Sequence, residues 1–88
     1  MKVLKFGAVW CKECLVMNSI WEEIETNMPK LETEYYDADE HPEVLEKYKV
    51  GEIPVFIFLD KEGGEIIRLN GAQNKDELVR LINEHTEK

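Results

Sequence analysis

The hydrophobic and polar positions of the chain follow two periods, two residues in some segments and about 3.6 in others, and these are the repeats of strands and helices. Cys14, Met17, Trp21 and Ile24, for example, recur at helical spacing directly after an apolar run of strand character. The pattern predicts, in order, a strand over 2–8, a helix over 11–28, a strand over 31–36, a short helix over 42–48, strands over 55–59 and 65–69, and a last helix from 74 onward.

The first two strands differ in their polarity. The strand over 2–8 is largely apolar on both faces, which is typical of a central strand covered on two sides. The strand over 31–36 carries Glu32 and Glu34, whose charges are costly in the centre of a sheet and suit an exposed edge. We therefore expect the first strand inside the sheet and the second at its edge.

Turn and capping residues separate the predicted elements. Pro42 stands where the first turn of a helix accepts proline, and Gly51 is expected to close the short helix that follows it. Gly63 and Gly64 mark a turn between the last two strands, which are predicted to form an antiparallel hairpin. Asn74, with a glutamate three residues later, resembles a capping box at the start of the last helix.

Length and charge narrow the possible classes of protein. The 88 residues, 43% of them hydrophobic, suffice for one domain, 1–88, with a single modest core. The net charge of −8 argues against nucleic acid and anionic membranes as partners, because both need a basic patch. No run approaches the ~20 apolar residues of a membrane span, and Met1 is followed by a strand-like segment rather than a leader. We therefore expect a cytoplasmic monomer.

The only two cysteines, Cys11 and Cys14, lie where the first strand gives way to the first helix. A single C-x-x-C pair cannot form the disulfide framework of a small secreted domain, so its chemistry is expected to be reversible. Cys11 falls at the first turn, where unpaired N–H groups and the helix dipole favour a thiolate. Cys14 falls one turn later on the apolar face, where burial favours the thiol. The spacing thus predicts two unlike sulfurs.

The segment WCKEC between a strand and a helix, followed some forty residues later by Ile53-Pro54 opening the run VFIFL, resembles the thioredoxin family. The resemblance covers nearly the whole chain. It implies an α/β thioredoxin fold in its minimal β-α-β-α-β-β-α form, with a four-stranded mixed central sheet flanked by helices. The extra strand and helix that usually precede the cysteine strand are absent, so the size is closer to that of a glutaredoxin.

The chemistry that these parts allow is thiol–disulfide exchange. The thiolate of Cys11, the nucleophile, attacks a partner disulfide, and Cys14, the resolving cysteine, then attacks Cys11 and releases the reduced partner. The resemblance implies a reductase of protein or small-molecule disulfides, recharged by a flavin-dependent reductase or another thiol donor. No bound cofactor is expected.

Three further residues are candidates for binding the substrate. Trp10 is expected to shield the sulfur of Cys11 and to offer an apolar surface, although an ordinary aromatic at a strand end fits the same pattern. A trans proline at the first residue of a strand would explain Pro54 equally well. The resemblance implies instead that the Ile53–Pro54 bond is cis, lies against the cysteines and offers backbone groups of Ile53 to a bound peptide.

Lys5 departs from the family pattern, since thioredoxins typically have a buried aspartate six residues before the first cysteine. The companion lysine of the family aligns with Tyr35, and Lys12-Glu13 replaces the common Gly-Pro pair, so redox potential and partner choice do not transfer. Two interpretations of Lys5 stay open. Its ammonium either extends to solvent and plays no part, or is partly buried and receives the proton of Cys14 or stabilises its thiolate.

Three other functions fit parts of the sequence. A C-x-x-C pair is half of a zinc site, with His41 and His85 as the remaining nitrogen ligands. A thioredoxin-fold binding module with idle cysteines is a second alternative, because a fold alone does not confer activity. A disulfide isomerase or thiol oxidase would use the same chemistry in another direction, and the reduction potential would distinguish it from a reductase.

Overall fold

The computed structural model describes residues 1–86 and places the elements in the predicted order. Each strand bound lies within one residue of the prediction, and the strand and helix bounds are β1 Lys2–Gly7, α1 Lys12–Asn27, β2 Glu32–Asp37, α2 Pro42–Lys47, β3 Val55–Leu59, β4 Glu65–Asn70 and α3 Lys75–Thr86.

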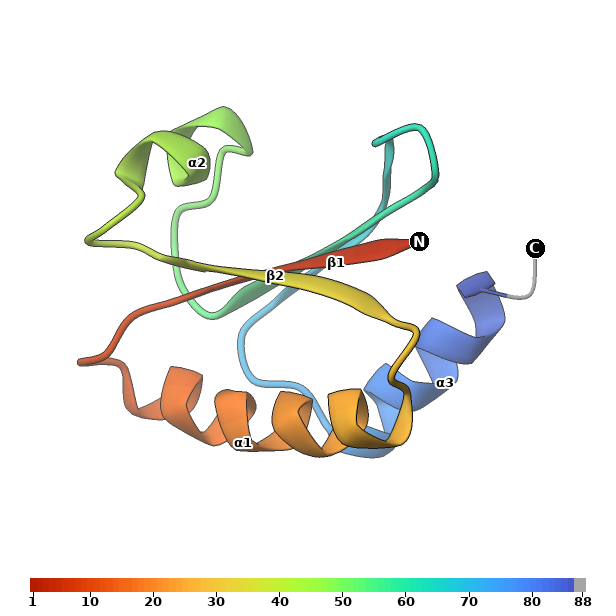
Figure 1. Cartoon of the computed structure of the whole chain (residues 1–88). Helices are drawn as coiled ribbons and strands as arrows, with labels where there is room; N and C mark the ends of the chain where they lie inside the picture. The colour runs from red at the N-terminus through yellow and green to blue at the C-terminus, as the bar shows by residue number, and fades with distance from the viewer. Residues whose placement is uncertain (87–88) are drawn as a thin grey trace.

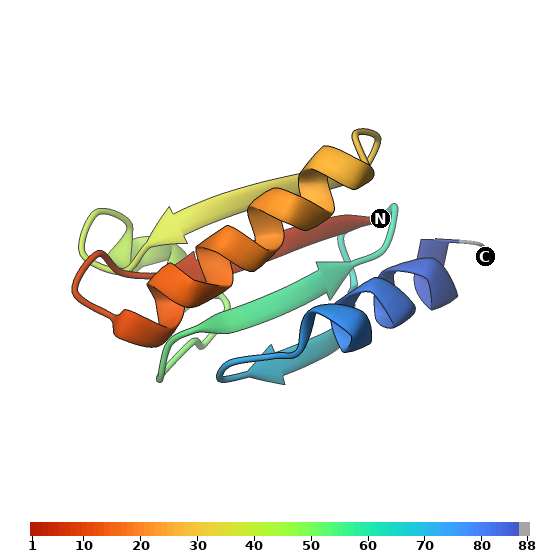
Figure 2. The same cartoon turned by 90° about the horizontal axis from the view of Figure 1, so that it is seen from below.

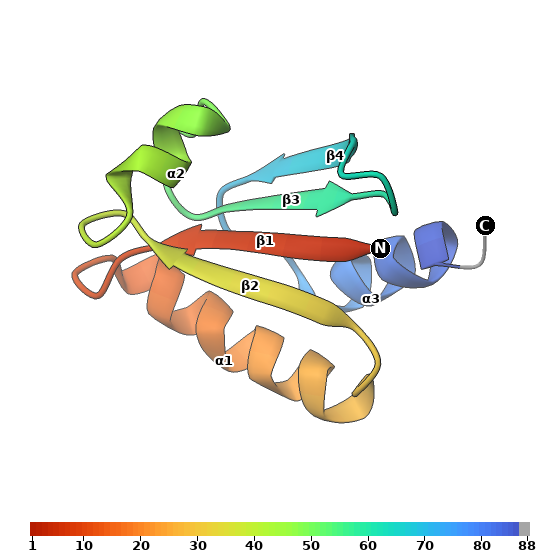
Figure 3. The ribbon, with the colours of Figure 1, turned by 45° about the horizontal axis from the view of Figure 1, so that its top comes forward.

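The four strands form one mixed sheet in the order β2-β1-β3-β4 (Figure 3). β1 runs parallel to β2 and antiparallel to β3, and β3 and β4 form the predicted antiparallel hairpin. β1 and β3 therefore occupy the centre and β2 an edge, as the polarity of their sequences predicts. The four-stranded mixed sheet and its minimal element order confirm the expected α/β fold.

The helices divide between the two faces of the sheet. α1 and α3 lie on one face and α2 on the other, as Figures 1 and 2 show from two directions. The smaller core, under α2, is built from Leu4, Phe6, Val55, Ile57 and Leu59, all of them buried. Because α2 is short, this cluster is completed by partly buried side chains of the segment that follows it.

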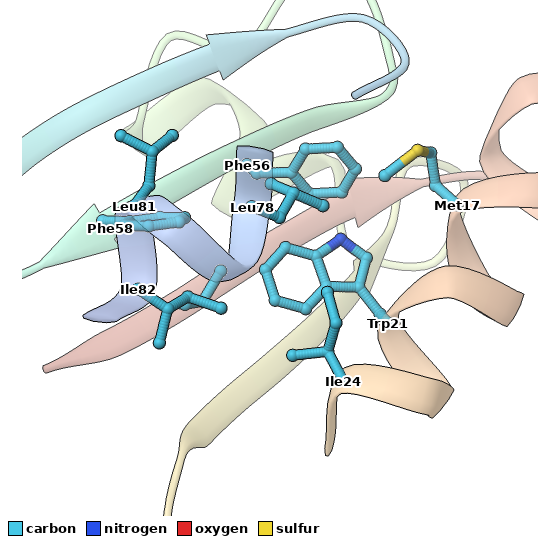
Figure 4. Close-up of a cluster of buried hydrophobic side chains, with 9 residues drawn as sticks. Met17, Trp21, Ile24, Phe56, Phe58, Leu78, Leu81 and Ile82 are labelled. Atoms are coloured by element: carbon cyan, nitrogen blue, oxygen red, sulfur yellow. The ribbon is translucent and has the colours of Figure 1, made fainter. Parts of the chain in front are cut away.

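The larger core lies between the sheet and the α1–α3 pair (Figure 4). Its centre is Trp21, which is 1% exposed and packs at a ring distance of 5.5 Å against Phe56 of β3. Burial of such side chains contributes about 1.5–3 kcal/mol each, so this cluster fixes α1 against the sheet. The buried residues of the cluster are Val3, Met17, Trp21, Ile24, Phe56, Phe58, Leu78, Leu81 and Ile82.

The end of α2 differs from the sequence prediction. The prediction that Gly51 closes this helix is wrong, because the left-handed residue is Lys49, with φ 56°. The N–H of Val50 then bonds the carbonyl of Leu45 at 2.8 Å, which closes the helix two residues earlier than expected. The side chain of Arg68 reaches across from β4 and donates to the carbonyls that this turn leaves free.

The loop before α3 is anchored at both of its ends. Asn74 caps the helix, since its Oδ1 accepts the backbone N–H of Asp76 at 2.8 Å and of Glu77 at 3.4 Å. One residue earlier, the N–H of Gln73 donates to the thioether sulfur of Met17 at 3.3 Å. The second contact ties α3 to the middle of α1.

In the part of the chain that the structure describes, no helix combines the length and the apolar character needed to cross a membrane.

Candidate active site

The candidate site lies at the end of the sheet where β1 finishes. β1 leaves the sheet at Gly7, and the loop that follows it runs beside the loop after β2, where the N–H of Ala38 donates to the carbonyl of Gly7 at 2.8 Å. The register pairs Phe6 with Val55, so Pro54 comes just outside the sheet at this same end. The loop after β1, the loop after β2 and the segment before β3 therefore lie at one end of the sheet. There they bring together the predicted site residues that follow β1 and precede β3.

Cys11 is the N-cap of α1, one residue before the helical position that the sequence predicts. Its backbone is extended, and its sulfur accepts the backbone N–H of Cys14 at 3.3 Å. The two sulfurs are unlike, because Cys11 is half-buried whereas Cys14 is 1% exposed. A sulfur that accepts the free amides of a helix start is well placed to carry negative charge.

Cys11 and Cys14 are linked as a disulfide. Their Cα atoms are 5.2 Å apart, inside the range of about 4.4–6.8 Å that disulfides require. Opening and closing this bond therefore needs no large movement of the backbone.

Trp10 is held by a residue that the sequence analysis did not single out. Its indole Nε1 donates to Oδ2 of Asp39 at 2.9 Å, and its side chain is 67% exposed. Asp37, which is buried, accepts the backbone N–H of Asp39 and of Glu40 through its Oδ1 and so fixes the loop. An aspartate at the end of a strand, two residues before another aspartate, is a signal for such a turn.

The Ile53–Pro54 bond is cis, as the resemblance implied. Pro54 is fully buried, and its carbonyl accepts the N–H of Gly71 at 2.8 Å. Ile53 is half-buried and packs against the core under α2. The backbone here is thus fixed at the end of the sheet that carries the cysteines.

Lys5 lies on the α1 face of β1, and its side chain is 13% exposed. Its Nζ is 2.6 Å from Oε2 of Glu25 and 5.8 Å above the ring of Trp21. Glu25 comes about three turns after Cys14 along α1. The structure therefore directs the ammonium along the helix and away from the cysteine pair.

The hydroxyl of Tyr35 and the side chain of Cys14 both border Gly7, a placement that no local sequence pattern predicts. A Cβ atom added to Gly7 would meet the hydroxyl of Tyr35 at 3.1 Å and the Cβ and Sγ of Cys14 at 3.2 and 3.3 Å. Burial, and then the negative charge of Asp37, raise the pKa of Tyr35 above its ordinary value. Alternation along β2 and the absence of a side chain at Gly7 were the available signals.

The two histidines lie apart from the cysteines. His41 pairs with Glu43 at 3.3 Å, and His85 packs edge-on against Phe58 on β3. Among residues 1–86, no three histidine, cysteine, aspartate or glutamate side chains are grouped so that they could hold a metal ion.

The comparisons with known proteins match this geometry. The thioredoxin family model matches residues 1–84. A thioredoxin of Chlamydia caviae is 36% identical over 84 residues, which are 96% of this chain and 81% of the relative. An H-type thioredoxin of Fagopyrum esculentum is 39% identical over 83 residues, 94% of this chain and 70% of the relative. The solved structure of thioredoxin 1 from Thermosipho africanus gives a TM-score of 0.86 at 29% identity and covers 99% of this chain and 96% of that one.

A capping cysteine bonded to a buried one, at the end of a mixed sheet, defines a dithiol–disulfide oxidoreductase. The family model and the relatives cover nearly all of the chain. The chain therefore belongs to the thioredoxin family, and its activity is that of a disulfide reductase.

Proposed function

We propose that this reductase acts on disulfides of proteins or small molecules in the cytoplasm, as a monomer recharged by a flavin-dependent reductase or another thiol donor. The observation that carries the proposal is the unlike exposure of the two sulfurs, since Cys11 is reachable at the helix start and Cys14 is 1% exposed. A partner disulfide would therefore meet Cys11 first.

The proposed cycle has two exchange steps. The thiolate of Cys11 attacks one sulfur of the partner disulfide, which forms a mixed disulfide and releases the other partner sulfur as a thiolate. The thiolate of Cys14 then attacks Cys11, the mixed disulfide breaks, and the second partner sulfur leaves as a thiolate. The partner gains two electrons, the protein loses two, and the two thiol protons of the protein end on the released thiols.

The proposed surface for the partner surrounds Cys11. Trp10 offers a largely exposed ring beside it, and Ile53 offers backbone groups just before the fixed carbonyl of Pro54. We propose that an extended peptide pairs with the backbone of Ile53 while its disulfide lies on Cys11. Val9, directly before Trp10 in the chain, is exposed as well.

For Lys5 we propose a supporting role. Its ion pair with Glu25 neutralises a charge that is only 13% exposed and ties β1 to α1. Handling of the Cys14 proton by Lys5, which the sequence suggested, is the competing assignment and requires the ammonium to leave Glu25.

Trapping the mixed disulfide tests the cycle. Cys14→Ser keeps the size of the side chain and cannot attack a disulfide, so the adduct through Cys11 should persist once excess thiol is excluded. In cells, this variant is expected to carry covalent adducts that dithiothreitol releases and mass spectrometry identifies. Cys11→Ser is the matched control and is expected to carry few, because Cys14 is buried.

The outcomes separate the proposed function from its alternatives. Equal adducts on both variants would contradict the assigned order of attack. Adducts on neither, together with inactivity of the parent protein in a dithiothreitol-coupled insulin turbidity assay, would favour a binding module. A strongly oxidising reduction potential would favour an oxidase or isomerase.

A further inference from the structure

Tyr35 of β2 and Cys14 of α1 both border Gly7. Tyr35 stands opposite Lys5 in the parallel register of β1 and β2, and Gly7 is two residues further along β1, so all three face α1. The hydroxyl of Tyr35 and the sulfur of Cys14 lie 3.1 and 3.3 Å from the same point, where a Cβ of Gly7 would be. Glycine is the one residue that leaves this approach open.

Asn18 lies close to Tyr35 on the α1 side of the sheet. Cys14 and Asn18 are four residues apart on α1 and therefore neighbours on one face of the helix. Asn18 and Tyr35 line the same shallow hollow on the α1 face, so the amide of Asn18 is a polar neighbour of the phenol. A phenol hydroxyl has one proton to donate, and this proton is available to a thiolate on Cys14.

The phenol is held in its protonated form. Burial raises its pKa most, and the negative charges of Asp37 and Glu40 raise it further, whereas the nearby amide of Asn18 acts in the opposite direction. The other charged groups that line this part of the α1 face are the Lys5–Glu25 pair and Glu22. A tyrosine that stays neutral through the physiological range is a hydrogen-bond donor and is not a base.

We propose that the hydroxyl of Tyr35 donates a hydrogen bond to the thiolate of Cys14 and so speeds the step in which Cys14 attacks Cys11. The inference rests on the proposed exchange cycle. Cys14 loses its proton to solvent, and Tyr35 keeps its own proton throughout. The S–S bond between Cys11 and the partner breaks, the bond between Cys11 and Cys14 forms, and the departing thiolate takes up a proton from solvent. Tyr35 thus acts at one of the two reacting sulfurs.

The reaction of the reduced protein with one equivalent of dithiobis(nitrobenzoate) resolves the two steps. Attack by Cys11 releases the first coloured thiolate, and attack by Cys14 on the mixed disulfide releases the second. Tyr35→Phe keeps the ring and removes only the hydroxyl. We expect the second phase to be about tenfold slower at pH 7 and its pH midpoint to rise by about one unit, because a hydrogen bond to a charged group has been lost. The first phase should be unchanged.

Tyr36→Phe is the matched control. Tyr36 is the next residue on β2 and packs on the opposite face, at a ring distance of 5.8 Å from Phe6, so neither phase should change. An unchanged second phase in Tyr35→Phe between pH 6 and pH 9 would overturn the inference, as would equal slowing in both tyrosine variants. A parent protein that shows no second phase at all would instead contradict the exchange cycle itself.

A second variant gives an independent test. Gly7→Ala places a methyl group at the point that the hydroxyl and the sulfur both border, and contacts of 3.1–3.3 Å require these neighbours to shift. We expect the second phase to be slower in Gly7→Ala also. In a Tyr35→Phe background, Gly7→Ala should slow the second phase by a smaller factor, because the hydrogen bond is already missing. Equal effects in the two backgrounds would contradict the inference.

Discussion

Asp39 holds the indole of Trp10 through a hydrogen bond of 2.9 Å between residues 29 positions apart in the sequence. The bond joins the loop after β1 to the loop after β2, and both loops border Cys11. The ring of Trp10 is therefore exposed and also oriented, which distinguishes it from an ordinary aromatic at a strand end.

Releasing the indole should weaken the reaction with protein substrates. For Asp39→Ala we expect kcat/KM in the insulin assay to fall about fivefold, because an exposed hydrogen bond to a charged group contributes roughly 1 kcal/mol. Glu40→Ala, which removes the neighbouring exposed carboxylate, is the control and should change kcat/KM less. If the two variants behave alike, general charge and not the orientation of Trp10 matters.

Alkylation of the reduced protein should distinguish the two cysteines. Iodoacetamide near pH 6.5 is expected to label Cys11 at least about tenfold faster than Cys14, because Cys11 caps the helix and Cys14 is 1% exposed. Mass spectrometry of peptides from a time course measures both rates. The difference should vanish in denaturant, and equal rates in the folded protein would remove the asymmetry on which the cycle depends.

Lys5→Met tests the competing assignment for the proton of Cys14. Methionine keeps the length of the side chain, and loss of the ion pair with the partly exposed Glu25 should cost about 0.5–1 kcal/mol in urea unfolding. We expect the pH profile of turnover between pH 6 and pH 9 to stay unchanged. Slower turnover with a shifted profile, in a variant that is still folded, would assign the proton step to Lys5.

Arg68 should stabilise the fold more than Arg80, although each arginine bonds a glutamate three residues before it. Only Arg68 also donates to the carbonyls of Tyr48 and Lys49, at 2.6 and 3.3 Å, where α2 ends. Arg68→Ala is therefore expected to lower the free energy of unfolding by about 1–2 kcal/mol. Arg80→Ala, at a fully exposed pair, should lower it clearly less. Urea unfolding of both variants gives the comparison.

The tyrosines of β2 should make the fold sensitive to alkaline pH. Burial first, and nearby carboxylates second, raise the pKa of both Tyr35 and Tyr36. Above the ordinary tyrosine value of about 10, the unfolded chain releases these protons while the folded chain keeps them, so stability falls as pH rises from there. We expect tyrosinate absorbance to appear at higher pH in the native protein than in denaturant, and less so after either Tyr→Phe change. Coincident titration curves would contradict the prediction.

The sequence predicts what depends on neighbours in the chain. The alternation of β1, the apolar run of β3 and the helical spacing after Cys11 are local patterns, and they are enough for the strand bounds and the two unlike sulfurs. The bond between Trp10 and Asp39 was not predictable in this way, because it depends on how two loops cross.

Two other differences have similar causes. The closeness of Tyr35 to Cys14 follows from the register of β2 on β1, which no local pattern specifies. Gly51 was the expected end of α2 because glycine adopts a positive φ most easily, whereas Lys49 takes that conformation. The carbonyls bound by Arg68 lie at this turn, and that contact comes from β4.

The contact between Gln73 and Met17 affects which methionines an oxidant reaches first. After each exchange cycle a thiol donor reduces the cysteines again, but thiol exchange does not repair a methionine sulfoxide, which needs a separate reductase. Met17 is 1% exposed and its sulfur already accepts a backbone N–H, whereas Met1 and Met28 are only half-buried. We therefore expect peroxide to oxidise Met1 and Met28 before Met17. Both lie at the ends of β1 and α1 that are far from the cysteines, so the packing beneath Cys14 is preserved longer.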